Sequence, residues 1–315
     1  MTALFTLQLV LPLVFVLWIA LAPPRSLLGF WIQFLATATG LLAAGLTGLW
    51  LLPPWWAPYA FGALLLLATV LGLRRRRPFD TRLPFSVMGW AGAVFFVVLG
   101  GFATYQAALP IAGRSLPSAT VANLAFPLEE GTYLVVNGGY DISINAHMAT
   151  LDLLVPQLQV WRGQSYGVDI VKINAAGLRS SGIQPPEPAA YLIYGTRVLA
   201  PCSGVVIASV DGLPDMPVPQ KDRAHMAGNH VILRCGDAHV MLGHLQPGSV
   251  KTKTGARVAV GDAIGAVGNS GNTVEPHLHL HAQRPGAVNQ PIAADPLPIR
   301  VGGRVLVRND RVSVP

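Results

Sequence analysis

The sequence predicts two regions of different fold class: an N-terminal transmembrane region of four α-helices and a mainly antiparallel β domain. The 315 residues are 52% hydrophobic and only 12% charged, whereas soluble domains carry about 25% charged residues. Residues 1–110 contain six arginines, one acid and no histidine. Beyond them, short apolar runs alternate with Gly, Pro, Asn and Asp, which is typical of β structure. We therefore expect domains at 1–110 and 111–315.

Four uncharged apolar stretches make up the membrane region. A helix needs about 20 apolar residues to cross a bilayer, and such stretches cover residues 1–22, 28–52, 55–73 and 85–108. The first has no basic segment and no small-residue cleavage site, so we interpret it as a span and not as a signal peptide. Buried helices of a soluble protein are the weaker alternative, because none of the four stretches has a polar face.

The arginines predict the orientation of these spans, because Lys and Arg near helix ends stay on the cytoplasmic side. Arg25 lies between the first two spans, and Arg82 and the arginines at 74–77 lie between the last two. The β domain then lies outside the cytoplasm. The arginine run also suits anionic lipid headgroups. Since most of the net charge of +7 comes from this region, we expect no nucleic-acid partner.

The two cysteines, Cys202 and Cys235, lie in apolar, strand-like runs of the second domain. In an oxidising compartment, two cysteines on neighbouring strands form a disulfide. Two buried free thiols are the alternative. Their spacing, without a CxxC motif, argues against a cysteine zinc site.

A histidine-rich strand carries the densest chemistry. Alternate residues of a strand face one way, so a strand at 277–282 projects His277, His279 and His281 from one face, about 7 Å apart. A solvent-facing polar stripe is the alternative. Zinc hydrolases use three His, Asp or Glu ligands and leave a fourth position to water. Asp169 stands within another apolar strand, where an unpaired carboxylate is costly, and His244 ends a further apolar run.

Several segments together resemble one known family. GTRVLAPCSGVV, GNHVIL, MLGHLQPGSV, GARVAVGDAIGAVGNSGNT and EPHLHLH follow one another in the order and spacing of the LytM/lysostaphin-type zinc metallopeptidases, the M23 peptidase family. The resemblance covers roughly residues 130–285. It implies the LytM/lysostaphin β fold, also called the duplicated hybrid motif, and Zn²⁺ as cofactor.

The resemblance also implies roles for individual residues. His279 and Asp169 match zinc ligands of the family. His244 and His277 match the catalytic histidines that act as general base and stabilise the tetrahedral intermediate. The family's remaining ligand is a histidine four residues before the aspartate, where this sequence has Ser165.

His147 is the candidate that replaces this missing ligand. It lies 22 residues before Asp169, with a loop at 148–164 between them, and the geometry of a zinc site does not depend on sequence spacing. An ordinary polar residue after a turn is the alternative. His281 lies on the site face, where support of the ligands is one interpretation. Three further histidines match no ligand position and are expected at the surface or in loops: His225, His230 and His239.

The resemblance implies a membrane-anchored zinc metalloendopeptidase, a hydrolase that cleaves peptide bonds of peptidoglycan with an activated water. Its peptidase domain would face the cell wall from the bacterial cytoplasmic (inner) membrane, on the periplasmic side. The alternative, which Ser165 keeps open, is a catalytically inactive M23-like domain that binds wall peptide or activates a partner hydrolase. A lipoyl- or biotinyl-type fold at GDAIGAVGNSG lacks an attachment lysine motif.

Overall fold

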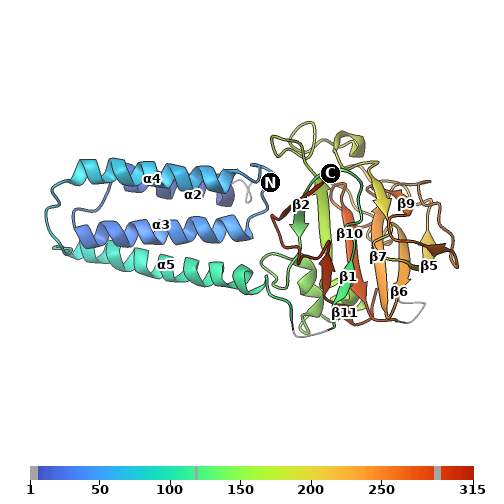
Figure 1. Cartoon of the computed structure of the whole chain (residues 1–315). Coiled ribbons are helices and arrows are strands. Elements are labelled where there is room, and N and C mark those ends of the chain that lie inside the picture. The colour runs from blue at the N-terminus through green and yellow to red at the C-terminus, as the bar shows by residue number, and fades with distance from the viewer. Residues whose placement is uncertain (1–5, 118–119, 287–291) are drawn as a thin grey trace. The chain divides into compact units, whose positions relative to one another are not determined.

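The computed structural model describes residues 6–117, 120–286 and 292–315. The chain divides into two compact units, Met1–Ile111 and Ala112–Pro315, and each is described by itself (Figure 1).

The first unit is a bundle of apolar helices. Its elements are η1 (Thr6–Val10), α2 (Leu11–Leu21), α3 (Leu27–Thr47), α4 (Ala57–Arg76) and α5 (Val87–Ala112). Helix α2 ends shortly before Pro23 and Pro24. A proline lacks the backbone N–H that another helical turn would require. The Ser26 side chain then caps α3 by accepting a hydrogen bond of 3.2 Å from the Gly29 backbone N–H.

Three helices of this unit are long and apolar enough to cross a membrane, namely α3, α4 and α5. The expected count of four spans is not confirmed. The segment Thr6–Leu21 is apolar but shorter, because the proline pair ends it, and residues 1–5 of the expected first span lie outside the described residues. By contrast, the 21 residues of α3 extend about 31 Å, which matches a hydrocarbon core of about 30 Å.

The helices pack closely through small residues and expose apolar side chains outward. Ile19, Phe30 and Leu65 form a buried cluster. A Cβ on Gly72 would lie 2.5 Å from the Ile19 carbonyl oxygen, so glycine permits α4 to approach α2. The outer faces of the helices carry many exposed Leu, Val, Phe and Trp side chains. A unit that is apolar both inside and outside suits a lipid environment.

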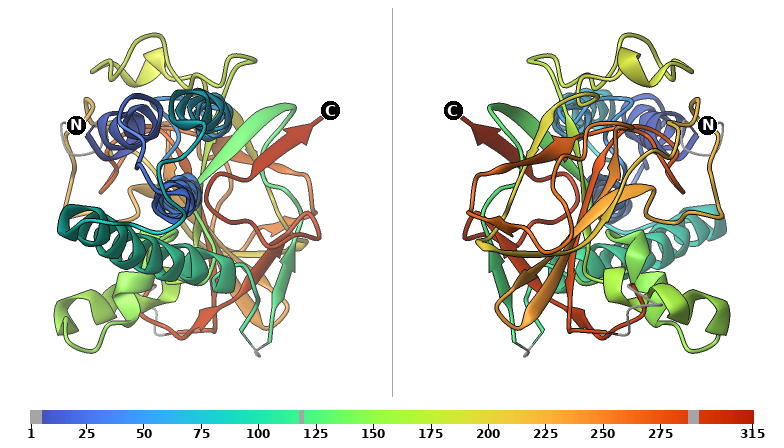
Figure 2. Two further views of the ribbon diagram at one scale, coloured as in Figure 1. Left: turned by 90° about the vertical axis from the view of Figure 1, so that its left-hand side faces the viewer. Right: turned by 90° about the vertical axis from the view of Figure 1, so that its right-hand side faces the viewer.

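The second unit is built on one long antiparallel sheet. The strand order is β13-β2-β3-β10-β7-β6-β5-β8, and β11 also pairs with β10. The strands of this sheet are β2 (Gly131–Asn137), β3 (Val168–Lys172), β5 (Gly204–Val210), β6 (Asn229–Cys235), β7 (Ala238–Leu245), β8 (Arg257–Val258), β10 (Leu278–Gln283), β11 (Pro296–Leu297) and β13 (Arg311–Val314). Both views of Figure 2 show β13, in dark red, beside β2, in green. A mainly antiparallel β domain is therefore confirmed.

Two small strand pairs and three short helices complete the unit. β1 (Ala122–Leu124) pairs in parallel with β12 (Ile299–Val301), and β4 (Arg197–Leu199) pairs antiparallel with β9 (Ala263–Ala266). The 3₁₀ helices are η2 (Ala146–Leu151), η3 (Pro156–Gln164) and η4 (Pro188–Ala190). The segment 148–164, expected as a loop, therefore lies largely in η2 and η3.

Strand β10 separates the core from the histidine face. Leu278, Leu280 and Ala282 pack into the core cluster with apolar residues of β2, β3, β6 and β7. His279 and His281 alternate with them, and every residue of β10 is buried. The histidine face is thus covered by other parts of the unit and does not face solvent, so the alternative of a solvent-facing stripe is wrong.

A disulfide joins Cys202 to Cys235, at the end of β6. Their Cα atoms lie 6.0 Å apart, and 33 positions separate them in the sequence. Closing a loop of this length in the unfolded chain stabilises the fold by about 3–4 kcal/mol on the chain-entropy estimate.

Candidate metal centre

The register of β3 and β10 places Asp169 directly beside His279. Residues opposite each other on adjacent strands direct their side chains to the same face of the sheet. The Nδ1 atom of His279 accordingly lies 2.8 Å from Oδ1 of Asp169. Both side chains are buried, with exposed fractions of 4% and 5%.

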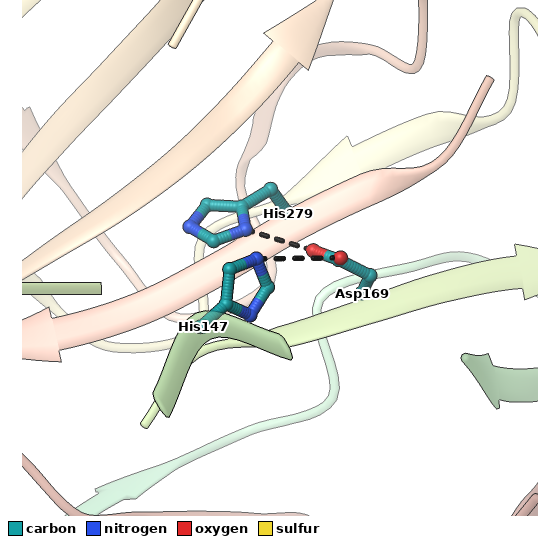
Figure 3. A group of neighbouring side chains, drawn as sticks. All are labelled: His147, Asp169 and His279. Carbon is teal, nitrogen blue, oxygen red and sulfur yellow. Dashed lines mark hydrogen bonds and ion pairs between the residues drawn. The ribbon is translucent and has the colours of Figure 1, made fainter. Parts of the chain in front are cut away.

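His147 approaches the same carboxylate from η2, outside the sheet (Figure 3). Its Nε2 atom lies 3.4 Å from Oδ2 of Asp169. One candidate ligand atom from each of His147, Asp169 and His279 lies within 4.8 Å of the other two. The structure therefore brings the three predicted metal ligands into one group.

Asn145 sets the orientation of the His147 ring. The amide of Asn145 donates to the carbonyl oxygens of Gly139 and Gly167, at 2.9 and 3.0 Å. Its Oδ1 therefore faces Nδ1 of His147, at 3.0 Å. Because an amide oxygen only accepts hydrogen bonds, Nδ1 carries the ring proton. The unprotonated Nε2 then points at Asp169.

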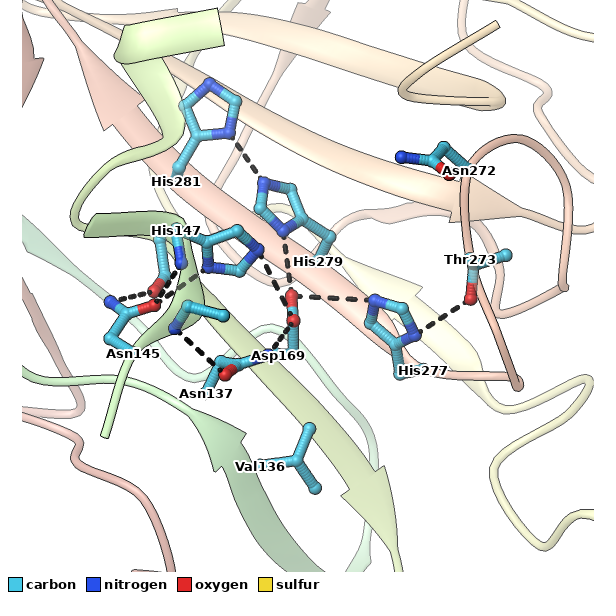
Figure 4. A network of polar contacts seen from close by, with 12 residues as sticks. Val136, Asn137, Asn145, His147, Asp169, Asn272, Thr273, His277, His279 and His281 are labelled. Carbon is cyan, nitrogen blue, oxygen red and sulfur yellow. Dashed lines mark hydrogen bonds and ion pairs between the residues drawn. The ribbon is translucent and has the colours of Figure 1, made fainter. Parts of the chain in front are cut away.

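His277 lies on the other side of Asp169 from His147 (Figure 4), and its ring contacts that of His244. Nε2 of His277 is 3.5 Å from Oδ1 of Asp169, and its Nδ1 is 2.9 Å from the Glu275 carbonyl oxygen. His244 is held by the Ser270 carbonyl oxygen, 2.9 Å from its Nδ1. The His244 and His277 ring centroids lie 4.8 Å apart. The structure thus brings both predicted catalytic histidines to the candidate metal group.

The backbone of His244 is strained. It has a φ of 61°, a left-handed conformation that costs a non-glycine residue of order 1–3 kcal/mol. His244 lies near the end of β7, where its backbone N–H donates to Ala227 at 2.9 Å. Strain of this kind concentrates at functional sites.

The electrostatic environment separates the two catalytic candidates. Burial, together with the neighbouring His277 and His279 rings, holds the pKa of His244 well below its usual value. Burial also lowers the pKa of His277, but the Asp169 carboxylate outweighs this effect and raises it. His244 is therefore the imidazole that stays neutral and has a nitrogen available for a proton, and His277 is the one that is more readily protonated. Groups whose environments push their pKa values apart are typical acid–base pairs.

The ligand candidates keep the forms that a metal requires. Burial lowers the pKa of His147 to about 4, so its imidazole is neutral near pH 7. Burial alone would raise the pKa of Asp169, but the His147 and His277 rings hold it well below its usual value. Metal ligands must be deprotonated, and both residues meet this condition.

All five predicted site residues line one cavity of about 360 Å³. Apolar side chains form much of its remaining wall: Leu158, Trp161, Met226, Met241, Val274 and Ile292. Lys221 also lines the cavity. The site is therefore open to a ligand with both apolar and charged groups.

Some residues of the site were not anticipated from the sequence. The side-chain amide of Asn137 donates to Oδ2 of Asp169 at 2.8 Å, and a register shift between Val135 and Asn137 in β2 places it there. Asn145, described above, was missed as well. The Ser165 hydroxyl is instead engaged by Thr150, at 2.7 Å.

The remaining histidines lie apart from the metal group. His225 is within 2.6 Å of Asp222 and exposed. His230 contacts the Gly228 carbonyl oxygen, and His239 pairs with Gln283 across β7 and β10. Within the described residues, the group that could hold a metal consists of His147, Asp169 and His279.

Part of the chain is similar to a known family of proteins. Residues 190–291 match the model of peptidase family M23. The matched segment contains His244, His277 and His279, whereas His147 and Asp169 precede it. This match confirms the resemblance drawn from the sequence. No curated protein sequence matched the chain.

Solved structures similar to the chain include three peptidases. The catalytic domain of lysostaphin from Staphylococcus simulans is 23% identical, over 41% of this chain and 74% of that one, with a TM-score of 0.27. A putative M23 peptidase from Pseudomonas aeruginosa is 19% identical, over 54% of this chain and 48% of that one, with a TM-score of 0.29. A zinc-containing peptidase from Vibrio cholerae is 21% identical, over 41% of this chain and 40% of that one, with a TM-score of 0.24. This chain thus spans less than half the length of the latter two.

Proposed function

We propose that the protein is a membrane-anchored zinc metalloendopeptidase that hydrolyses peptide bonds in peptidoglycan peptides. The observation that carries the proposal is the convergence of His147, Asp169 and His279 within one cavity that also contains His244 and His277. The match of residues 190–291 to a peptidase family supports the reaction class.

The donor set of this group fits zinc. Two imidazole nitrogens and a carboxylate are the ligand set of several catalytic zinc sites, which leave a fourth position open. The hydrogen bond between His147 Nδ1 and Asn145 leaves Nε2 unprotonated, as metal binding requires. His147 thus takes the place that Ser165 leaves empty. When bound, zinc supplies Lewis-acid chemistry that polarises a carbonyl and lowers the pKa of water.

His244 and His277 perform the proton transfers. The Nδ1–H of His244 donates to the Ser270 carbonyl oxygen, so its unprotonated Nε2 is the atom that accepts a proton from the attacking water. His277 donates from Nδ1 to Glu275, and its raised pKa favours a second proton on Nε2. This N–H stabilises the oxyanion of the tetrahedral intermediate and protonates the leaving amine.

The cavity suits a peptide with both apolar and acidic groups. Its walls are largely apolar, and Lys221 is the one lining residue among those described with a fixed positive charge. We place the β unit outside the cytoplasm, where it meets the cell wall. The arginine-rich segment near the end of α4 and the Cys202–Cys235 disulfide support this location.

The alternative function, a catalytically inactive domain that binds wall peptide or activates a partner hydrolase, is not favoured. It rested on Ser165, which removes the usual ligand, but His147 lies 3.4 Å from the Asp169 carboxylate. The site therefore has three candidate ligands and two candidate catalytic histidines.

Peptidoglycan hydrolysis by the full chain tests the proposal. The protein, purified in detergent with zinc, is expected to release new amino groups from isolated peptidoglycan. His244→Ala removes the proton acceptor and is expected to lower the rate by about 100-fold or more. His239→Ala is the matched control, since His239 lies outside the cavity. Absence of peptide cleavage by the wild type, or an unchanged rate in His244→Ala, would contradict the proposal.

A further inference from the structure

Both ring nitrogens of His279 have partners, and one of them is another histidine. Nδ1 of His279 lies 2.8 Å from the Asp169 carboxylate, and Nε2 lies 2.8 Å from Nδ1 of His281 (Figure 4). The two histidines are two positions apart on β10, so they share one face of the strand. His279 is thus the ligand candidate whose Nε2, the ring nitrogen that does not face Asp169, contacts another imidazole.

The proton between these two histidines decides whether His279 can bind a metal. If Nε2 of His279 carries the proton and donates it to His281, Nδ1 is unprotonated and available as a ligand atom. If His281 were the donor, the proton of neutral His279 would sit on Nδ1, between it and Asp169. The first arrangement suits metal binding, and the second blocks it.

We propose that His281 is a positioning residue for the metal centre: its Nδ1 accepts the Nε2–H of His279 and selects the tautomer in which His279 Nδ1 binds zinc. This inference rests on the proposed zinc site. It assigns His281 a role that the match to the peptidase family does not provide.

The surroundings of His281 favour this role over one in packing. The residue is 1% exposed, and its own Nε2 has no hydrogen-bond partner in the described part of the chain. A neutral imidazole that accepts at Nδ1 carries its proton on Nε2, so a buried N–H remains unpaired at a cost of about 1–3 kcal/mol. An apolar side chain at position 281 would remove this N–H but would leave the Nε2–H of His279 without an acceptor. The hydrogen bond to His279 is what a histidine adds here.

Gly167 gives the histidine pair its room. A Cβ on Gly167 would lie 3.0 Å from Cε1 of His279 and 3.2 Å from Cβ of His281. The Gly167 carbonyl oxygen also accepts from Asn145, which orients His147. The supports of both histidine ligands therefore meet at this glycine.

Zinc binding by two variants of the full chain tests the role of His281. His281→Phe keeps a ring but removes the acceptor, whereas His281→Asn keeps an oxygen near the position of Nδ1. Competition with a chelator, on protein in detergent, measures the zinc dissociation constant. We expect zinc binding to weaken about 10- to 100-fold in His281→Phe, and His281→Asn to recover most of the loss. His239→Phe, on the neighbouring strand, is the matched control.

Thermal unfolding of the metal-free variants separates positioning from packing. His281→Phe removes the unpaired N–H of His281 but leaves the Nε2–H of His279 without its acceptor, so metal-free His281→Phe is expected to be about as stable as the wild type, although it binds zinc more weakly. If the phenylalanine does not fit, His281→Leu takes its place. Wild-type zinc affinity in the apolar variant, or equal losses in the apolar variant and His281→Asn, would overturn the inference. A wild type that binds no zinc would instead overturn the proposed function.

Discussion

The proton positions on individual histidines decide what this site can do. His147 directs an unprotonated nitrogen at Asp169 because Asn145 occupies its other ring nitrogen, and in the proposed arrangement His281 does the same for His279. Asp169 has its own supporting residue, Asn137, which donates to Oδ2 at 2.8 Å. Loss of such contacts to ligands typically weakens metal binding about 10- to 100-fold.

Removal of the Asn137 amide should weaken the metal site without removing a ligand. Asn137→Ala leaves Oδ2 of Asp169 without this donor, and we expect about a 10-fold weaker zinc affinity, measured by chelator competition. Asn123→Ala, an exposed asparagine on β1, is the control. An unchanged affinity in Asn137→Ala would show that Asn137 does not support the ligand.

The site residues differ in how far the sequence could predict them. The strand period indicated His277 and His279, and the family motifs indicated Asp169 and His244 as well; the structure brings all four to one cavity. His147 required a choice among histidines, since its position depends on the path of η2. Asn137 and Asn145 were not predicted, because a register shift and a cap bring them to the site, and neither leaves a periodic signal.

At the scale of elements, strand pairing holds the site together. The register between β3 and β10 sets Asp169 beside His279, and a slip of one residue would turn one side chain to the opposite face. A buried ion pair holds the segment before β10. Arg179 donates to both oxygens of Glu275, at 2.7 and 2.8 Å, and the Glu275 carbonyl oxygen contacts His277.

Breaking this ion pair should destabilise the fold and disturb His277. Arg179→Met leaves the Glu275 carboxylate buried without its partner, which costs about 3–5 kcal/mol. Urea unfolding of the full chain in detergent measures the loss. The double variant with Glu275→Gln removes the unpaired charge and is expected to recover part of the stability. Equal stability of Arg179→Met and the wild type would contradict a structural role for the pair.

The histidine-rich strand was predicted better than the short helices. The strand expected at 277–282 is β10, Leu278–Gln283, because alternation of apolar residues and histidines marks it clearly. The helices η2 and η3 were expected as a loop. Each spans few residues, so neither carries enough turns to produce a helical period.

At the scale of the whole molecule, the chain joins an apolar helical unit to a β unit that holds every histidine. The composition also indicates two regions, because charge and histidine content change near residue 110. The number of spans was harder to predict, since apolar length does not show where the proline pair ends α2. Three helices of spanning length are present among the described residues. The orientation of these helices in the membrane stays a prediction.

Protease access to spheroplasts tests that orientation. With the arginine-rich segment in the cytoplasm, external protease is expected to digest the β unit while the membrane is intact. Detection by an antibody against the β unit follows the digestion, and a cytoplasmic protein serves as control. Digestion that requires membrane disruption would place the β unit in the cytoplasm and contradict its proposed access to the cell wall.

Anomalous scattering at the zinc edge, from crystals of the full chain, tests the central claim most directly. The account predicts about one zinc ion per chain, bound by Nε2 of His147, the Asp169 carboxylate and Nδ1 of His279. A site without zinc, or a zinc ion that His147 does not bind, would contradict it.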